Sequence, residues 1–336
     1  MKICTYLRST PTGISKRLGL LVDGNLMVDP NLVIQAHYEN EGYYDPKMRA
    51  LLNLPPSLAA FLKTEDCPLI ALQGALDRYK EFAKNGQLQT KDGADLAFDL
   101  RDQKDVRFAA PIDEVHSYRD FFVHEKHVAT GFAKRNEPIP PSWYEMPIYY
   151  KGATTGFIGD GDTIPWPTFS QQLDYELELG VVIGRDGKNI KAKDIYKHVL
   201  GFTILNDVSA RDIQKKEMAG RLGPAKGKDW CSVIGPVIVT ADEFGFKDPD
   251  LLMTASVNGQ EWSRGRSGEA HWSWGEMIEH FTRDEWARAT DFLGSGTVGT
   301  GCGLELDKWI KPGDVVELEI EGIGKLKNTV GIPAQP

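Results

Sequence analysis

Apolar runs along the chain are mostly short, and glycine-rich turns separate them, a pattern that predicts β-strands. We expect strands over residues 2–7 and 17–28, and the second turns at Asp23-Gly24, a dipeptide typical of two-residue hairpins. Residues 48–54, 56–63 and 72–85 show helical character, and Asn85-Gly86 ends the last of these segments. Together these features predict a small β-rich N-terminal domain over residues 1–108.

After residue 108 the expected strands follow one another mainly through turns. They cover residues 174–184, 198–205, 235–240, 252–257, 260–263, 315–320 and 325–330. Helical periodicity is clearest over residues 122–134 and 273–292. Strands joined by turns rather than by crossover helices favour a mixed or antiparallel sheet. The pattern therefore predicts a mixed, β-rich α+β fold with a second domain over residues 109–336.

The composition is that of an ordinary folded protein with an acidic balance. Hydrophobic residues make up 41% of the chain, and 39 Lys and Arg oppose 48 Asp and Glu, for a net charge of −9. A shortage of basic residues argues against nucleic acid as a partner. No apolar run approaches the roughly 20 residues of a membrane span, and we expect no signal peptide. The 4 cysteines form no CxxC pair, so we expect neither a Cys-type zinc site nor disulfide bonds. The lack of a disulfide framework favours a cytoplasmic protein.

The strongest local signal is the segment DYELELGVVI, which begins at Asp174. In a strand, Glu176 and Glu178 project from the same side, about 6–7 Å apart. Two carboxylates beside a core face repel each other and are costly to desolvate, and a cation would relieve both effects. An acidic solvent face on a half-exposed strand explains the motif equally well.

Two further polar motifs, NDVSARDIQ and LGPAKGKDW, follow in the chain. Helix capping accounts for Asp207 and Ser209 but not for Arg211 and Gln214. A loop lysine such as Lys228 is usually solvated. Taken singly, these motifs do not indicate one activity.

The chain resembles the fumarylacetoacetate hydrolase family over about residues 109–336. The resemblance rests on the order of the three motifs, which a GSGT turn and then the segment PGDVVELEIEGIGKLKN follow. The resemblance implies a mixed β-sheet roll that forms the catalytic domain and binds a divalent metal through carboxylates alone. Oxygen ligands without Cys or His favour Mg²⁺, Ca²⁺ or Mn²⁺ over zinc. The ligands that it implies are Asp120, Glu176, Glu178 and Asp207.

The upstream domain and a matching dyad make the chain similar to the longer, fumarylacetoacetase-like branch of the family. His127 matches the general-base histidine, and Glu305 matches the glutamate that orients it. A carboxylate bonded to one ring nitrogen fixes the tautomer, so that the other nitrogen can take a proton from water. Other matched positions bind the substrate carbonyl and the developing charge, or contact the substrate elsewhere; they are Arg211, Gln214, Lys228, Tyr150, Thr297 and, less directly, Arg135.

Two substrate positions depart from the family pattern. Phe122 and Met218 stand where fumarylacetoacetase has tyrosines, so hydroxyl contacts are lost. A site without these polar partners rejects the ligand that needs them. We therefore expect metal-dependent hydrolysis of a carbon–carbon bond in another 1,3-diketo acid, such as an acylpyruvate. The alternatives are a metal-dependent 2-keto acid decarboxylase, dehydratase or isomerase, and a non-catalytic metal-binding protein.

Other features of the sequence concern possible metal and nucleotide sites, the oligomeric state and a lid. His124 and His127 have the spacing of a zinc pair, but the sequence offers no third ligand nearby, which favours surface histidines. GSGTVG at residues 294–299 matches the GxGxxG motif of dinucleotide-binding sites, but it follows a predicted helix rather than a strand, so we expect no such site. Cys302 is expected to be inert packing. The resemblance implies a homodimer, for which the Trp-rich residues 262–286 offer apolar area. Residues 124–143 are expected to form a mobile lid that closes over the substrate.

Overall fold

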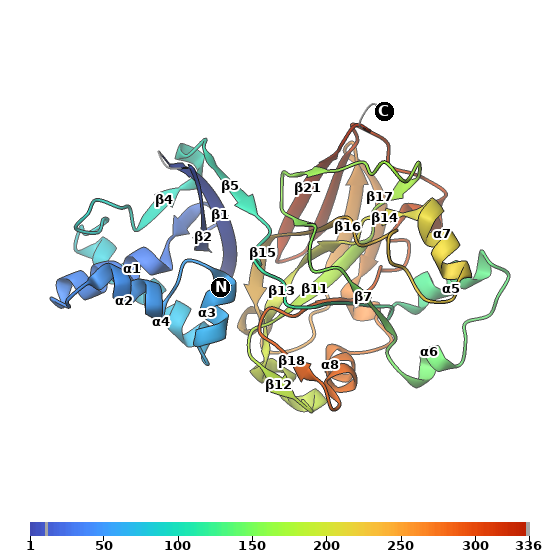
Figure 1. The fold of residues 1–336 in the computed structure, drawn as a ribbon, viewed down its shortest axis with the longest axis horizontal. Helices are drawn as coiled ribbons and strands as arrows, with labels where there is room; N and C mark the ends of the chain where they lie inside the picture. Colours follow the sequence, from blue (N-terminus) through green and yellow to red (C-terminus); the bar gives the residue numbers. More distant parts are fainter. Residues whose placement is uncertain (11–12, 334–336) are drawn as a thin grey trace.

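The computed structural model describes residues 1–10 and 13–333. Figure 1 shows an N-terminal part with helices on its outer side and a larger, strand-rich C-terminal part beside it. Within the described residues, a twelve-stranded sheet runs through both parts in the order β4-β3-β2-β1-β15-β13-β11-β19-β6-β7, with β5 added to β1 and β8 to β15. The C-terminal part also contains a five-stranded sheet in the order β17-β16-β20-β21-β9 and two two-stranded sheets, β10-β14 and β12-β18.

The N-terminal part is a small antiparallel sheet with helices packed on it. β1 (Lys2–Thr10) pairs with β2 (Gly13–Val22), which turns into β3 (Leu26–Val28), and β4 (Ala97–Asp99) pairs with β3. Asp23 and Gly24 have positive φ, as the predicted hairpin turn requires. The helices are α1 (Pro30–Asn40), α2 (Pro46–Asn53), α3 (Leu58–Thr64) and α4 (Pro68–Lys84).

Helix α1 is not among the elements predicted from the hydrophobic pattern. Its start carries a clear local signal, because the Asp29 side chain accepts a hydrogen bond from the Leu32 amide and Pro30 follows the cap. An aspartate cap with proline in the first turn is a favoured way to begin a helix. The apolar face of α1 is short, which is why periodicity alone did not indicate it.

Strand β1 joins the two parts of the molecule. Lys2 and Ile3 pair with Val239 and Ile238 of β15 (Ser232–Thr240), in the middle of the large sheet. β5 (Val106–Ala109) lies at the predicted boundary and also pairs with β1. The division at residue 108 stays a prediction, and a continuous hydrogen-bonded sheet crosses it.

The C-terminal core lies between the two sheets. β11 (Leu177–Ile183) and β13 (Val199–Asn206) are buried along their whole length, as their continuous apolar sequences require. The facing sheet contains β16 (Leu252–Val257), β17 (Gln260–Arg266), β20 (Val315–Ile320), β21 (Gly324–Val330) and β9 (Thr163–Ile164). Burial alternates along β16 and β20, so one face of this sheet packs on the core and the other meets solvent.

Short strands and helices complete the C-terminal part and carry most of the polar motifs. The remaining strands are β6 (Tyr118–Phe121), β7 (Tyr149–Gly152), β8 (Phe157–Ile158), β10 (Leu173–Asp174), β12 (Gly187–Lys188), β14 (Ser209–Ala210), β18 (Trp286–Ala287) and β19 (Phe292–Gly294). The helices are α5 (Glu125–Ala133), α6 (Ser142–Glu145), α7 (Arg211–Ala219), α8 (Trp274–Thr282) and α9 (Gly303–Leu306).

The helix predicted over residues 273–292 is too long. Ser273 and Glu276 form a capping box that begins α8, but the helix ends at Thr282. Asp284 has a positive φ of 61°, which a helix cannot contain, and the later apolar residues belong to β18 and β19. The GSGT turn therefore follows a strand and not a helix, although no helix begins after it until α9.

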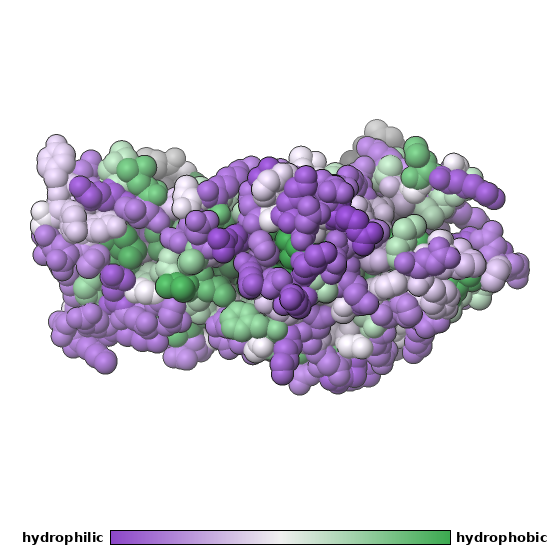
Figure 2. All heavy atoms as spheres, turned by 90° about the horizontal axis from the view of Figure 1, so that it is seen from below, coloured by the Kyte–Doolittle hydropathy of each residue, from purple (hydrophilic) through white to green (hydrophobic). Residues whose placement is uncertain are grey.

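The surface is largely polar where Figure 2 shows it. On this face, hydrophilic residues surround small hydrophobic areas. Such scattered apolar areas are normal for a solvated surface. Within the residues that the structure describes, no helix has both the length and the apolar character needed to cross a membrane.

Candidate active site

Four buried carboxylates from neighbouring strands meet at one end of the large sheet. Asp120 lies on β6, Glu178 on β11 and Asp207 directly after β13, while Glu176 precedes β11 and forms an isolated bridge with Cys302. Each carboxylate offers an oxygen within 4.8 Å of the others. Because β6, β19, β11 and β13 are successive strands, the sheet brings these residues together. The half-exposed acidic face that the sequence left open is therefore excluded.

The acidic cluster, defined by Asp120, Glu176, Glu178 and Asp207, carries more negative charge than the protein neutralises. Burial and the Asp207 charge raise the pKa of Asp120, and burial and Asp120 raise the pKa of Glu178. Burial would also raise the pKa of Glu176, but Lys228 and Arg211 outweigh it and hold that pKa below its usual range.

Two cationic side chains from the other motifs are buried against the cluster. Lys228 forms an ion pair with Glu176 Oε2 at 2.6 Å and another with Asp207. Arg211 Nη2 bonds Glu176 Oε1 at 2.7 Å, and Arg211 Nη1 donates to Gln214 Oε1 at 2.8 Å. The loop that carries Lys228 thus places its lysine in the site, contrary to the usual solvated state of such residues.

Asp174 is an important residue that the sequence analysis did not single out. It is fully buried and accepts hydrogen bonds from Arg211 Nε at 2.8 Å and from the amides of Gly303 and Leu304 at 2.7 and 2.9 Å. Asp174 therefore orients Arg211 and fixes the start of α9 at the same time. Its place in the motif DYELE, two residues before Glu176, is the signal that could have identified it.

The donor set suits a hard divalent cation. Including Asp174, five carboxylates face two cations, an excess of three formal negative charges in a buried site. Asp207 Oδ1 is buried and has no hydrogen-bond partner among the described residues. The Gly296 amide donates to Asp120 Oδ1 at 3.2 Å and to Glu178 Oε2 at 3.0 Å, which fixes both carboxylates. An all-oxygen site of this kind fits Mg²⁺, Ca²⁺ or Mn²⁺.

The predicted dyad is formed by elements far apart in the sequence. His127 on α5 places Nδ1 3.2 Å from Glu305 Oε2 on α9, and both side chains are buried. Glu176 is paired through its backbone with Cys302, three residues before Glu305, so the dyad lies beside the acidic cluster. His124 is buried as well, and the expectation of surface histidines is wrong for both residues.

The predicted substrate positions divide into two groups. Tyr150 donates to Asp207 Oδ2 at 2.7 Å, Thr297 donates to Glu178 Oε1 at 3.4 Å, and the Phe122 ring stands edge-on to His127 with centroids 5.5 Å apart. Met218 is 43% exposed near the end of α7, and the exposed Arg135 pairs with Glu137 at 3.3 Å. The structure brings the first three to the site, and the roles of all five stay predictions.

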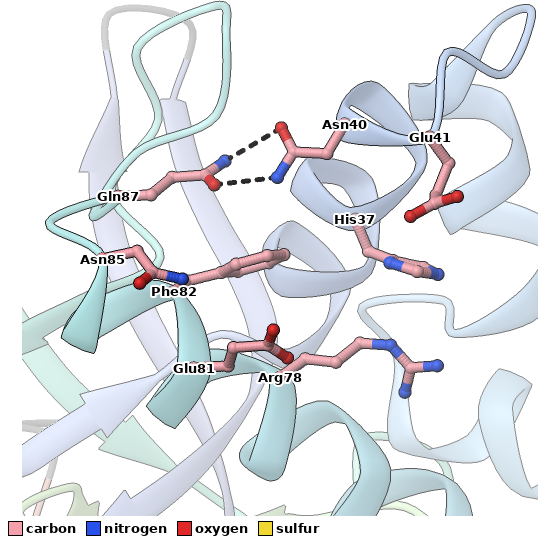
Figure 3. A pocket seen from close by; sticks show the side chains of 8 residues that line it. All are labelled: His37, Asn40, Glu41, Arg78, Glu81, Phe82, Asn85 and Gln87. Carbon is pink, nitrogen blue, oxygen red and sulfur yellow. Dashed lines mark hydrogen bonds between the residues drawn. The ribbon is translucent and has the colours of Figure 1, made fainter.

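A surface pocket between α1 and α4 is a weaker candidate for a functional site (Figure 3). Asn40 and Gln87 exchange hydrogen bonds of 2.8 and 3.4 Å across it. Charges of both signs line it, and none belongs to a cluster of the kind seen around Asp120. Its lining residues are His37, Asn40, Glu41, Arg78, Glu81, Phe82, Asn85 and Gln87.

Comparison with known proteins agrees with the geometry of the site. Residues 117–331 match the family model described as fumarylacetoacetate (FAA) hydrolase C-terminal. This chain belongs to the fumarylacetoacetate hydrolase family. The matched segment contains the acidic cluster, the dyad and both buried cations, and enzymes of this family bind a divalent metal.

Relatives of this family member include oxaloacetate tautomerases. Oxaloacetate tautomerase YisK of Bacillus subtilis is 34% identical over 190 residues, 56% of this chain and 62% of that protein. The human mitochondrial oxaloacetate tautomerase FAHD2A is 33% identical over 199 residues, 59% of this chain and 62% of that protein. The chain thus aligns with less than two thirds of the length of either protein.

Solved structures of the family share the fold over nearly the whole chain. The crystal structure of Cg1458 with inhibitor has 25% sequence identity, a TM-score of 0.68, and coverage of 99% of this chain and 100% of its own. A fumarylacetoacetate hydrolase from Exiguobacterium antarcticum has 24% identity, a TM-score of 0.67, and coverage of 98% and 100%. These likenesses confirm a fumarylacetoacetate-hydrolase-type fold with mixed β-sheets and an N-terminal β-rich domain.

Proposed function

We propose that this enzyme hydrolyses a carbon–carbon bond in a 1,3-diketo acid of the acylpyruvate type. The observation that carries the proposal is the pair His127–Glu305, held at 3.2 Å beside the acidic cluster. Metal binding alone does not require a buried histidine whose Nδ1 lies 3.2 Å from a carboxylate oxygen. Hydrolysis does require such a group, because a water molecule must lose a proton as it attacks the carbonyl carbon.

The residues around the cluster suit the other demands of this reaction. Asp120, Glu176, Glu178 and Asp207 would hold Mg²⁺ or a similar ion, which would polarise the oxygens of the diketo acid. Glu305 Oε2, 3.2 Å from Nδ1 of His127, would accept a hydrogen bond from the protonated Nδ1, so that Nε2 is free to take a proton from water.

Arg211, Lys228 and Gln214 act on the substrate. Arg211 and Lys228 are buried cations that would attract the substrate carboxylate and the negative charge of the departing enolate. Gln214 accepts a hydrogen bond from Arg211 through its side-chain oxygen, so its amide N–H group would be free to donate a hydrogen bond to the substrate carbonyl. Burial strengthens these interactions because little water screens them.

A second candidate is keto–enol isomerisation of a 2-keto acid such as oxaloacetate. The names of the relatives from Bacillus subtilis and human mitochondria favour it. The same dyad could move a proton between carbon and oxygen without activating water. Both candidates pass through an enolate stabilised by the same cationic residues, and only the presence of an attacking water separates them.

The proposal is tested with purified protein that is stripped of metal and then supplied with Mg²⁺ or Mn²⁺. We expect turnover of some acylpyruvates only with metal, and a large loss of kcat in the Glu305→Gln variant. Glu261→Gln, an exposed position on β17, is the matched control and should retain full activity. Metal-dependent acylpyruvate cleavage that Glu305→Gln leaves unchanged would overturn the role of the dyad.

A further inference from the structure

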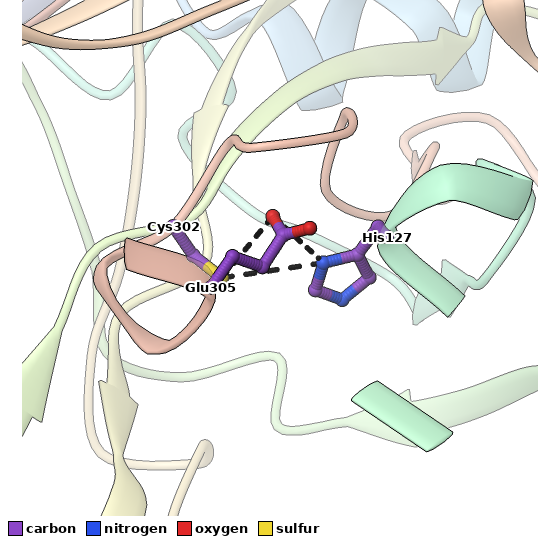
Figure 4. A group of neighbouring side chains, drawn as sticks. All are labelled: His127, Cys302 and Glu305. Atoms are coloured by element: carbon purple, nitrogen blue, oxygen red, sulfur yellow. Dashed lines mark hydrogen bonds and ion pairs between the residues drawn. The ribbon is translucent and has the colours of Figure 1, made fainter. Parts of the chain in front are cut away.

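Three metal-binding side chains of different chemistry meet at the dyad (Figure 4). Cys302, just before α9, places Sγ 4.0 Å from His127 Nδ1 and 3.7 Å from Glu305 Oε2. The three ligand atoms lie within 4.8 Å of one another, as a site for one metal ion requires. The sequence offered no third ligand near the histidines, and folding supplies two from a segment about 175 residues away.

A second observation also indicates a ligand at this place. The Glu305 side chain is 3% exposed, and its Oε1 is buried without a hydrogen-bond partner among the described residues. A buried carboxylate oxygen without a partner is costly, and a cation bound to the same carboxylate would offset part of that cost. Asp174 holds the first amides of α9, so Cys302 and Glu305 are fixed relative to each other.

The distances among these atoms approach those of a tetrahedral zinc site. With bond lengths of about 2.3 Å to sulfur and about 2.0–2.1 Å to nitrogen and oxygen, tetrahedral ligands lie about 3.6 Å apart where sulfur is involved and about 3.3 Å otherwise. The structure has 4.0 and 3.7 Å for the sulfur pairs and 3.2 Å for nitrogen and oxygen. Shifts of a few tenths of an ångström would therefore complete the geometry, with water as the fourth ligand.

We propose that His127, Cys302 and Glu305 bind a second divalent cation of the Zn²⁺ type, and that this cation inhibits the enzyme. Sulfur and imidazole ligands select Zn²⁺ or Co²⁺ over Mg²⁺, whereas the acidic cluster has the oxygen ligands that Mg²⁺ prefers. As the metal–sulfur bond forms, the thiol proton passes to solvent. The Nδ1 proton of His127 shifts to Nε2, so that the cation can bind the Nδ1 lone pair together with the Glu305 carboxylate. With its proton on Nε2, His127 can no longer accept a proton from water. The inhibition rests on the proposed function, but the site itself does not.

The site is tested by spectroscopy, independently of activity. Co²⁺ is added to the Cys67→Ser/Cys231→Ser protein in the presence of saturating Mg²⁺, so that the exposed thiol of Cys67 is removed and the acidic cluster is filled. We expect a thiolate-to-cobalt charge-transfer band that saturates at one equivalent and disappears when Cys302→Ser is added. Absence of the band from the double variant, or its persistence after Cys302→Ser, would overturn the proposal.

Inhibition is measured with any keto acid that the Mg²⁺-loaded enzyme converts. We expect micromolar Zn²⁺ to inhibit the wild type, and Cys302→Ser and Cys302→Ala to need at least tenfold more Zn²⁺ while their basal turnover is unchanged. Equal sensitivity of the wild type and both variants would refute inhibition through this site. If no keto acid is converted, the proposed function fails, and the cobalt spectrum still decides whether the site exists.

Discussion

Replacing one carboxylate of the acidic cluster should stabilise the metal-free protein while it abolishes the response to metal. Glu178→Gln removes a charge from a fully buried group whose neighbours are also acidic. The amide oxygen can still accept the hydrogen bond that the Gly296 amide gives at 3.0 Å. The variant thus changes the charge of the site and very little of its shape.

The size of the effect follows from the distances in the cluster. Two unit charges 4.8 Å apart repel by about 3.5 kcal/mol at an effective dielectric constant of about 20. Burial and the charges of neighbouring carboxylates raise the pKa values of Asp120 and Glu178, and the protonation that this favours already relieves part of the repulsion. We therefore expect a gain of about 1–3 kcal/mol, or about 1.5–4 °C in Tm for a chain of this length.

The assay is thermal unfolding with and without Mg²⁺. At Mg²⁺ concentrations of about 100 times Kd, the wild type should gain about 2.7 kcal/mol, and Glu178→Gln almost nothing. Glu319→Gln, at an exposed position on β20, is the control and should change stability by no more than about 0.5 kcal/mol. A Glu178→Gln variant that is less stable without metal and responds normally to Mg²⁺ would refute the assignment of this cluster as a metal site.

Three further predictions concern residues near the site. His127→Gln should lower kcat about 10²–10⁴-fold and leave the Mg²⁺-induced Tm shift intact, and loss of that shift would indicate a structural role instead. Burial lowers the pKa of His124 from 6.5 to about 3, so the unfolded chain takes up a proton that the folded chain excludes. Stability should fall as the pH drops through this window, by about 2 kcal/mol at pH 5. Thermal melts of His124→Gln should show a weaker pH dependence than those of His37→Gln, and equal slopes would contradict this reasoning. Hydrogen exchange across residues 124–143 should slow when Mg²⁺ and a diketo-acid analogue bind, whereas unchanged exchange with bound analogue would mean that the dyad is formed in advance.

The sequence predicted the central strands well because their patterns are local. The run LELGVVI predicted a strand but left its exposure open, and it became β11 with all residues buried. The helix over residues 273–292 was overestimated because Phe292 lies eleven residues, about three helical turns, after Phe281 of α8, although Phe292 belongs to strand β19. Periodicity cannot distinguish one long helix from a helix followed by short strands when both bury similar residues.

The candidate site was predicted through motifs, and the contacts that depend on the fold were not. Glu176 and Glu178 share a side of one strand segment, so a two-residue spacing sufficed to pair them. The contacts of Asp174 with α9, and of Cys302 with His127, join segments more than 120 residues apart. Such contacts depend on the alignment of the sheets, which no local pattern encodes.

The most direct test of the proposed function is proton NMR of the products that the Mg²⁺-loaded enzyme forms from an acylpyruvate in D₂O. We expect two acids, pyruvate and the acid of the acyl group, in equal amounts. We also expect cleavage to stop without metal and nearly to stop in Glu305→Gln. Rapid exchange of the methylene protons for deuterium with no cleavage, together with fast isomerisation of oxaloacetate, would contradict hydrolysis and identify the enzyme as a tautomerase.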